Sequence, residues 1–233
     1  MTFNTSKCKV MVFNSAIKQI IFTSDKTVLE IVHTYRYLGV IPSSKYVTNL
    51  FKAHFQYILQ KAKRKAAAMR CHVFGTSGFR IKSSVKLYKL QVRPLLEFSA
   101  QSLSFIPYSQ PAHPDVVGCF AKRLEHLQAQ LLKSLINCPR ATSPAIARVF
   151  CGIEPLACRL EILKLRYFWK MSHGPTNALC SLILKYRRDR LLDFNKGFAQ
   201  DAFNICTTYN IMHIWHGVAP LNSLHRNLKL NYA

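Results

Sequence analysis

Hydrophobic and polar residues follow two different periods along this chain, and the period changes near residue 46. Before that point, short apolar and β-branched runs at 9–13, 20–22, 27–31 and 35–41 alternate with polar residues, as strands do. The polar residues 23–26 lie between two of these runs and indicate a hairpin turn. The first 45 residues therefore predict a small antiparallel meander, which makes too little core to stand alone.

From residue 47 onward, apolar residues recur at the spacing of an α-helix. The first stripe consists of Phe51, Phe55, Ile58, Ala62, Ala66 and Met69. Further helices are predicted at 81–90, 95–106, 116–137, 144–151, 156–171, 177–192 and 199–215. Pro94 kinks or restarts the second helix, whereas Ser143 and Pro144 open a later helix that Gly152 closes. The three prolines within 107–114 indicate a linker.

These patterns predict an α+β fold that is mainly α, with a small N-terminal sheet followed by a helical body. A chain of 233 residues is long enough for one large domain or two small ones. The change of period and the linker divide it into residues 1–45, 46–108 and 109–233.

The charge balance predicts the chemistry of a binding partner. The chain has 33 Lys and Arg against 10 Asp and Glu, a formal net charge of +23. Its hydrophobic content of 49% is that of a folded protein, so the charge is displayed on a folded body. A polyanion offsets such self-repulsion, and both nucleic acid and an anionic membrane face have that chemistry.

Membrane and secretory signals are weak. The best membrane candidate, 95–106, is shorter than the ~20 apolar residues of a spanning helix and contains Glu97. The polar N-terminus is not followed by a signal-peptide core, and the eight cysteines form no close pairs. We expect reduced thiols, a nuclear or cytoplasmic location, no secretion and no membrane.

The helix predicted at 49–70 carries the strongest binding signal. Its candidate nucleic-acid contacts are Lys52, Lys61, Lys63, Arg64, Lys65 and Arg70. Cations spread over three turns can follow the phosphates of a strand, and His54 and Tyr57 are placed to contact sugar or base. The alternative is a solvated face that keeps the protein soluble.

Other groupings of reactive side chains are less specific. Asp189 and Asp193 stand among arginines, which favours local ion pairs over a metal site. The zinc-like groupings are Cys151 with Cys158, and Cys206 with His213 and His216. Their spacing is looser than in structural zinc sites, so buried thiols and a helical histidine pair are the better interpretation. We expect no metal site, no catalytic residue and no cofactor, because two-metal polymerase chemistry needs paired carboxylates and no Asp-Asp pair is present.

Five segments resemble one protein family. Asn4-Thr-Ser-Lys7-Cys8-Lys9 is similar to the Asn-x-x-Lys-Thr-Lys strand of non-LTR (LINE-type) retrotransposon reverse transcriptases, with Cys8 in place of Thr. Tyr37-Leu38-Gly39 resembles the Tyr-Leu-Gly motif of their primer-grip region. The other three segments are Leu87-Tyr88 with 92–97, Leu124-Glu125-x-x-Gln128, and 152–156 with Arg159. Their order and spacing match the thumb and the helices beyond it, over residues 4 to about 172.

The resemblance implies the end of the palm, the thumb and the downstream helices, without the catalytic Asp-Asp hairpin and the fingers. Lys7 and Lys9 are then phosphate contacts or surface residues, and Tyr37, Leu38 and Gly39 form a turn that supports the primer end. Lys61, Lys63, Arg64 and Lys65 would line the thumb face along a template-primer duplex. Mg²⁺ is expected for the complete polymerase alone.

The hypothesis is thus a non-catalytic reverse-transcriptase fragment that binds RNA, DNA or an RNA–DNA duplex without regard to sequence. The alternative is a helical protein-interaction module, in which the apolar face of 116–137 docks a partner and the charge serves solubility. A further alternative, peripheral binding to anionic lipid, requires an exposed apolar face beside a basic one.

Overall fold

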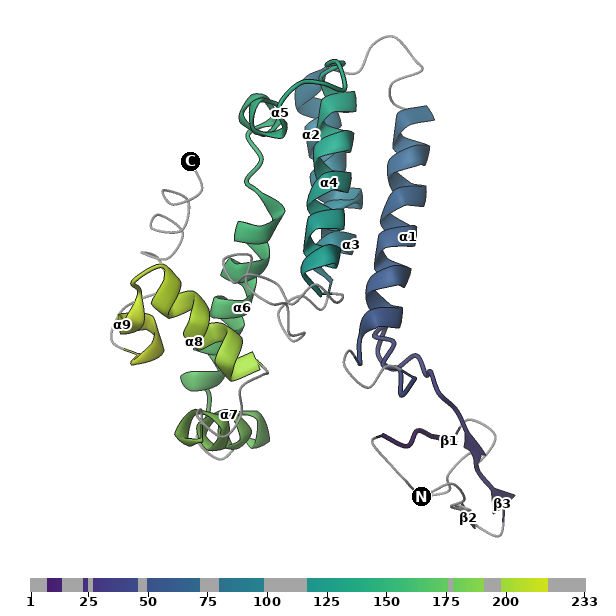
Figure 1. The fold of residues 1–233 in the computed structure, drawn as a ribbon, viewed down its shortest axis with the longest axis vertical. Coiled ribbons are helices and arrows are strands. Elements are labelled where there is room, and N and C mark those ends of the chain that lie inside the picture. The colour runs from purple at the N-terminus through teal and green to yellow at the C-terminus, as the bar shows by residue number, and fades with distance from the viewer. Residues whose placement is uncertain are drawn as a thin grey trace. The chain divides into compact units, whose positions relative to one another are not determined.

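The structure is a computed structural model that describes residues 8–13, 23–24, 27–45, 50–71, 80–98, 117–175, 178–190 and 198–217. The chain divides into two compact units, residues 1–58 and 59–233. The fold is mainly helical with a small sheet component, which confirms the predicted class (Figure 1). The predicted boundaries at 45/46 and 108/109 adjoin or lie in segments outside the described residues, so they remain predictions.

The strands are two residues long each. They are β1 (Lys9–Val10), β2 (Thr23–Ser24), β3 (Thr27–Val28) and β4 (Glu30–Ile31). β2 and β3 pair antiparallel, as the predicted hairpin requires. β1 and β4, however, pair in parallel, so the prediction of an entirely antiparallel meander is wrong. The reason is that residues 11–29 separate the two strands, and a connection of that length can return the chain for parallel pairing.

The helices occupy most of the second unit. They are α1 (Lys52–Met69), α2 (Ile81–Gln91), α3 (Arg93–Glu97), α4 (Val117–Leu135), α5 (Pro144–Cys151), α6 (Leu156–Ser172), α7 (Leu179–Asp189), α8 (Phe198–Thr208) and α9 (Met212–Trp215). α1 begins in the first unit and continues into the second. α2 and α3 are separated at Val92, with a proline at the start of α3, as the sequence predicts.

Three helices end in the same way, with a residue in the left-handed conformation. Asn137, Gly152 and Asn210 follow α4, α5 and α8 with φ of 51°, 58° and 52°. In each case the next N–H bonds a carbonyl five residues earlier, namely Cys138 to Lys133, Ile153 to Arg148, and Ile211 to Cys206, at 3.0, 3.0 and 2.8 Å. This is the Schellman pattern. Asn210 therefore splits the single helix predicted at 199–215 into α8 and α9.

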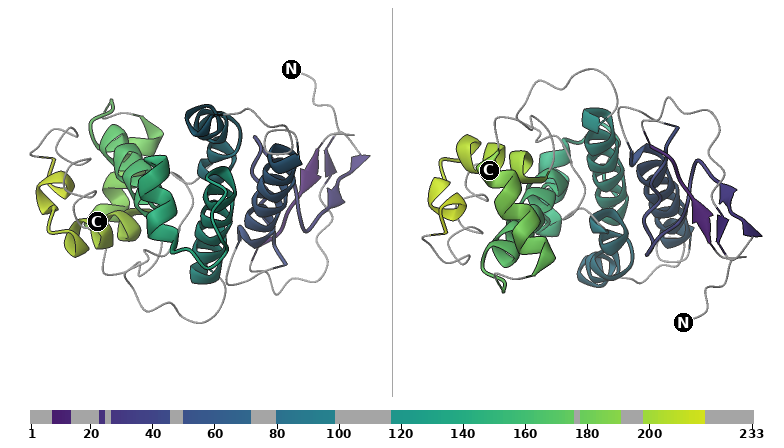
Figure 2. Two further views of the ribbon diagram at one scale, coloured as in Figure 1. Left: turned by 90° about the horizontal axis from the view of Figure 1, so that it is seen from above. Right: turned by 90° about the horizontal axis from the view of Figure 1, so that it is seen from below.

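The helices of the second unit form two neighbouring groups. α2, α4 and α5 pack on one another, and α6 contacts α4, α7 and α8. The views from above and below show the green and yellow helices α6–α9 gathered together (Figure 2). The apolar face of α4, including Leu124, Leu127, Leu131 and Leu135, is buried. The fold itself therefore covers the described part of the surface that the interaction-module alternative had assigned to a partner.

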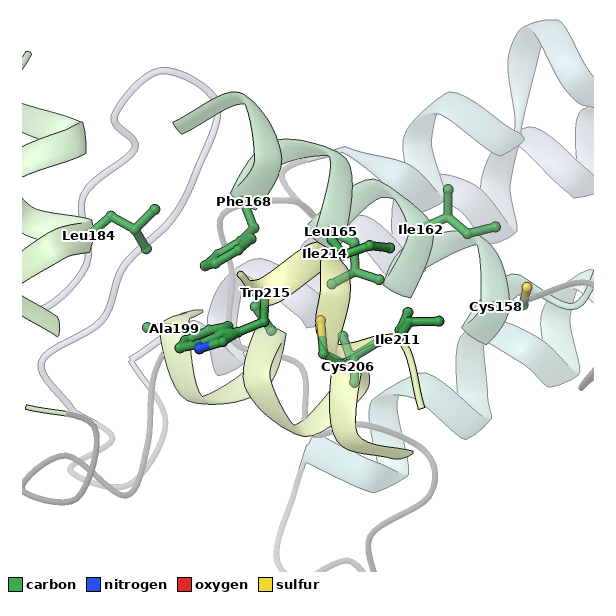
Figure 3. Close-up of a cluster of buried hydrophobic side chains, with 12 residues drawn as sticks. Cys158, Ile162, Leu165, Phe168, Leu184, Ala199, Cys206, Ile211, Ile214 and Trp215 are labelled. Atoms are coloured by element: carbon green, nitrogen blue, oxygen red, sulfur yellow. The ribbon is translucent and has the colours of Figure 1, made fainter. Parts of the chain in front are cut away.

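The group α6–α9 encloses an apolar core (Figure 3). Phe168 of α6 stacks on Trp215 of α9, with ring centroids 5.0 Å apart and planes within 10° of parallel. Phe203 of α8 meets the same indole edge-on at 5.2 Å. At the border of this core, the Lys164 ammonium is buried and donates to Asp201 of α8 at 2.5 Å. Aromatic packing and one buried ion pair thus join α6, α8 and α9.

Candidate nucleic-acid interface

The predicted basic helix is present as α1, and its apolar stripe is buried as expected. Phe55, Ile58, Ala62, Ala66 and Met69 are all buried, and Phe51 at the start of the stripe is half-buried. Of the candidate nucleic-acid contacts, those exposed to solvent are Lys61, Lys63, Arg64, Lys65 and Arg70, whereas Lys52 is half-buried. The helix contains no Asp or Glu, so no acid within it offsets these cations.

The cations of α1 do not gather on one side of the helix. Lys61 and Lys65 are four residues apart and share one flank of the buried stripe. Lys63 lies on the other flank and Arg64 on the side opposite the stripe, while Arg70 directly follows the helix. A strand laid along α1 therefore contacts one flank and leaves the other in solvent.

Four other predicted contact residues have different outcomes in the structure. His54 is completely buried, and burial lowers the pKa of its imidazole to about 4, so the prediction that it contacts sugar or base is wrong. Tyr57 is half-buried, and the guanidinium of Arg36 lies over its ring at 5.5 Å. Lys9 forms an ion pair with Glu30 across β1 and β4, so its charge has a partner. Lys7 lies outside the described residues.

The motif Tyr37-Leu38-Gly39 forms the predicted turn. The N–H of Tyr37 donates to the carbonyl of Val40 at 2.8 Å, and the N–H of Val40 donates back at 2.9 Å. Leu38 and Gly39 both have positive φ, 48° and 86°, as the type I′ hairpin turn requires. Gly39 adopts this conformation without strain, whereas Leu38 does so at a cost and is exposed. An exposed, strained leucine at a turn is a candidate contact residue.

Most of the described carboxylates are engaged in ion pairs or hydrogen bonds with other side chains. Ion pairs with Lys or Arg engage Glu30, Glu97, Glu125, Glu154 and Asp201. Glu161 accepts the hydroxyl of Tyr209 at 2.9 Å, and Asp189 is exposed on α7. Within the described part of the chain, no carboxylate pairs with Lys63, Arg64 or Lys65. These three cations of α1 are therefore displayed on the surface.

A second basic surface was missed by the sequence analysis. Lys82, Lys86 and Lys89 of α2 are all exposed. Their spacing of four and three residues places them on one flank of the helix. These lysines recur at helical spacing in the sequence, but the predicted binding helix was chosen for its denser cluster of basic residues at 61–65.

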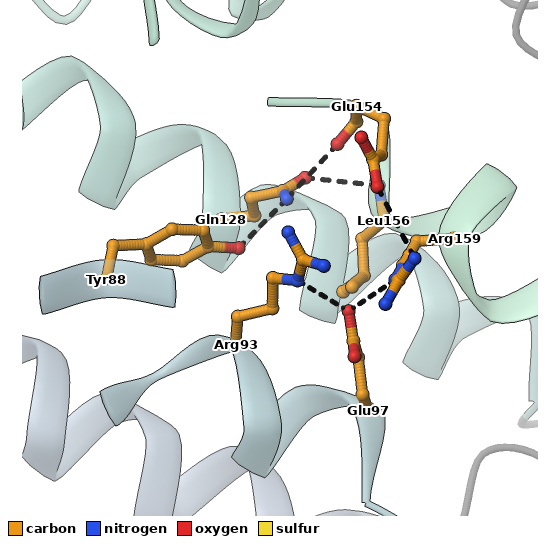
Figure 4. Close-up of polar contacts among 7 residues, drawn as sticks. All are labelled: Tyr88, Arg93, Glu97, Gln128, Glu154, Leu156 and Arg159. Atoms are coloured by element: carbon orange, nitrogen blue, oxygen red, sulfur yellow. Dashed lines mark hydrogen bonds and ion pairs between the residues drawn. The ribbon is translucent and has the colours of Figure 1, made fainter. Parts of the chain in front are cut away.

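Residues from three of the family-like segments meet in one polar network (Figure 4). The amide of Gln128 lies at its centre and is buried. Its nitrogen donates to the Tyr88 hydroxyl at 2.9 Å and, at 3.4 Å, to the carbonyl of Glu154, while its oxygen accepts the N–H of Leu156 at 3.1 Å. The network therefore fastens α2 and α4 to the start of α6.

Glu125, one turn earlier on α4, completes this joint. Its carboxylate accepts the N–H groups of Leu156 and Ala157 at 2.8 and 3.2 Å and the Arg148 guanidinium at 2.7 Å. α6 has Pro155 at its N-cap position, with no side-chain cap of its own. Glu125 thus caps α6 from another helix, and its negative charge is favourable at that positive helix end.

Charged residues of these family-like segments form an adjoining ion-pair cluster. Glu97 accepts Arg93 at 2.8 Å and Arg159 at 2.9 Å, and Arg159 also approaches Glu154 at 3.8 Å. All four side chains are largely buried, so these groups hold helices together rather than facing solvent.

The cysteine groupings have the expected apolar surroundings. Cys151, Cys158 and Cys206 are buried, and Cys158 and Cys206 belong to the α6–α9 core. Burial raises the pKa of the Cys206 thiol to about 12, which keeps it protonated and a poor metal ligand. Among the described residues, no cluster of His, Cys, Asp and Glu has the arrangement of a metal site.

The basic group 187–190 makes ring contacts. Arg188 lies over Trp215 at 5.4 Å and Arg190 over Tyr186 at 4.9 Å. Asp193 lies outside the described residues. The same helix exposes an apolar stripe consisting of Leu179, Leu182, Ile183 and Tyr186.

Comparison of the chain with protein-family models, with curated proteins and with solved structures found no match. In the described ranges, no helix combines the length and apolar character needed to cross a bilayer.

Proposed function

We propose that this chain binds nucleic acid without regard to sequence, as the thumb and downstream helices of a non-LTR reverse transcriptase without a catalytic centre of its own. One observation carries the proposal: the described carboxylates are mostly engaged in joints between structural elements, while the basic residues of α1 from Lys61 to Lys65 and those of α2 are exposed. Point charges of this kind contact phosphates, which position a ligand but do not read its sequence.

The polar network supports the part of this proposal that rests on family resemblance. Tyr88, Glu97, Gln128 and Arg159 come from segments far apart in the chain, yet they lie in two adjoining clusters. Segments that resemble one family and also interlock are expected of a single inherited unit. In this proposal, the Tyr37–Val40 turn supports the primer end, and Mg²⁺ belongs to the complete polymerase alone. The nucleus or the cytoplasm supplies RNA, DNA or their hybrid as the ligand.

The test is the salt dependence of binding to a labelled RNA–DNA hybrid, measured by fluorescence anisotropy. With about six phosphate contacts, raising salt from about 50 to about 200 mM weakens binding by ~10³-fold. Replacing Lys61, Lys63, Arg64 and Lys65 by Ala lowers the affinity for hybrids of different sequence by the same factor. An affinity that does not change with salt would exclude phosphate binding, and hence the proposal.

A protein-interaction module is the second candidate, and the exposed stripe Leu179, Leu182, Ile183 and Tyr186 of α7 favours it. Lys185, Arg187 and Arg190 surround this stripe, so the matching partner is a protein surface with apolar and acidic side chains. Light scattering with and without RNA–DNA hybrid separates the candidates, because nucleic-acid binding adds the mass of the hybrid to the protein.

A further inference from the structure

The lysine flank of α2 differs in kind from the basic surface of α1. Lys82, Lys86 and Lys89 stand in one row, and α2 contains no acid. At about 1.5 Å per residue, the row is about 10 Å long. Among the described residues, no carboxylate pairs with any of the three ammonium groups.

The opposite face of α2 fixes the direction of this row. Ser84, Val85 and Tyr88 are buried, and the Tyr88 hydroxyl accepts a hydrogen bond from Gln128 of α4. The helix cannot turn about its axis without breaking this contact and exposing Tyr88, which is 0% accessible. The three lysines are therefore presented together on a helix that is already in place, so binding need not order the backbone.

We propose that Lys82, Lys86 and Lys89 bind successive phosphates along one strand of the nucleic acid and form the principal phosphate contact of the chain. Phosphates of one strand advance about 3.4 Å each along a duplex axis while the strand follows a longer helical path, so a row of about 10 Å reaches about two to three successive phosphates. The flexible lysine stems adjust each ammonium to its phosphate. The inference rests on the proposed function and assigns its main contact to α2, because the cations of α1 point to different sides.

The linear arrangement favours a nucleic-acid strand over an acidic protein segment. A phosphodiester strand repeats its charge at a fixed interval, which suits a row of identical point charges. Ile81 and Leu90 of α2 are exposed near the two ends of the row, so the regular spacing of the three charges, and not an absence of apolar groups, favours a strand over a protein surface.

The decisive variant is K82Q/K86Q/K89Q, compared with the conservative variant K82R/K86R/K89R. Glutamine and arginine have helix propensities close to that of lysine, and the three side chains are exposed, so both variants are expected to fold. The probes are a labelled 20-base-pair RNA–DNA hybrid and a labelled 20-nucleotide single strand, each titrated at several salt concentrations. Far-UV circular dichroism verifies the fold of each protein.

Removing three contacts lowers the slope of log affinity against log salt by about 2.7 for the hybrid and about 2.1 for the single strand. At about 100 mM salt, the affinity falls by ~10²-fold or more. The arginine variant keeps the slope of the unmodified protein. A slope reduced by less than about 1, or a loss of slope in the arginine variant as well, overturns the inference.

The matched control is K185Q/R187Q/R190Q, which removes two charges from α7 and one from the residue that follows it. If it reduces the slope as much as the α2 variant does, net charge alone explains binding and the α2 row is not the contact. Polyglutamate is the competitor that tests the protein alternative. If it displaces the hybrid from the unmodified protein but not from the α2 variant at equal charge concentration, the row is a general acidic-peptide site and the inference is wrong. An unmodified protein that binds neither nucleic-acid probe refutes the proposed function itself.

Discussion

Glu125 provides the sharpest test of how this fold is held together, because one carboxylate performs three tasks. It accepts two backbone N–H groups at the start of α6 and pairs with Arg148 of α5. Its side chain is 16% exposed. Replacing Glu125 by Ala therefore removes the cap of a 17-residue helix and the partner of a largely buried guanidinium at the same time.

The size of the effect follows from these contacts. Losing a helix cap costs about 1 kcal/mol, and leaving a partly buried charged group without its hydrogen bond costs about 1–3 kcal/mol more. We expect Glu125→Ala to lower the free energy of unfolding by about 3 kcal/mol. For a protein of this size, that is a decrease in Tm of roughly 6–12 °C. Glu125→Gln keeps an acceptor for the amides but loses the charge, so we expect a loss of about 1 kcal/mol.

Urea unfolding followed by far-UV circular dichroism measures both variants. Asp189→Ala is the matched control, since it removes an exposed carboxylate from a helix of the same unit and is expected to change stability by less than about 0.5 kcal/mol. A loss below about 1 kcal/mol for Glu125→Ala, or one equal to the control, would refute the idea that α6 is capped from α4. Glu125→Gln should leave the salt slope of nucleic-acid binding unchanged, since Glu125 lies in a helix joint.

Three further predictions concern other parts of the molecule. The pKa of His54 is about 4 in the folded state against 6.5 in the unfolded state. About 3 kcal/mol of stability is therefore present above pH 6.5 and is lost as the pH falls toward 4. Urea unfolding of His54→Gln at a series of pH values should not show this loss. Leu38→Asn should raise the free energy of unfolding of its unit by about 1 kcal/mol, measured by hydrogen exchange, because Asn tolerates positive φ better than Leu does. Lys164→Met and Asp201→Leu should each lower the free energy of unfolding by about 3 kcal/mol or more, measured by thermal unfolding, because each single change leaves a buried charge without its partner. The double variant should be close to the unmodified protein in stability. Additive losses in the double variant would contradict this.

Local signals predicted the helices well, because the residues that begin and end a helix act on their own neighbours. Ser143 accepts the N–H of Ala145 at 3.3 Å, and Gly152 closes α5 in the left-handed conformation, as the sequence indicated. Asn210 has the same role after α8, but the apolar periodicity across 199–215 concealed it. Asparagine favours the left-handed conformation less than glycine does, so its role at a helix end is less apparent from sequence.

The sequence patterns could not predict contacts between residues that are far apart in the chain. The cap of α6 comes from Glu125, which is 31 residues earlier, and no local motif specifies such a pairing. The parallel pairing of β1 with β4 also depends on where residues 11–29 carry the chain. The burial of His54 also depends on long-range packing. From the sequence alone, a histidine among basic residues is predicted to be exposed.

The described charged side chains fall into two groups, those in joints between helices and those exposed on the surface of α1 and α2. Most of the described acids pair with basic or hydroxyl groups at joints such as Glu125–Arg148 and Lys164–Asp201, so removing one of these acids lowers stability. Lys63, Arg64 and Lys65 of α1 and the three lysines of α2 are exposed and outside these joints, so we expect that removing one alters the surface and leaves the helix contacts intact. Stability and polyanion binding are therefore carried by separate sets of side chains. A change in the first set should shift the unfolding midpoint at constant salt slope, and a change in the second should do the reverse.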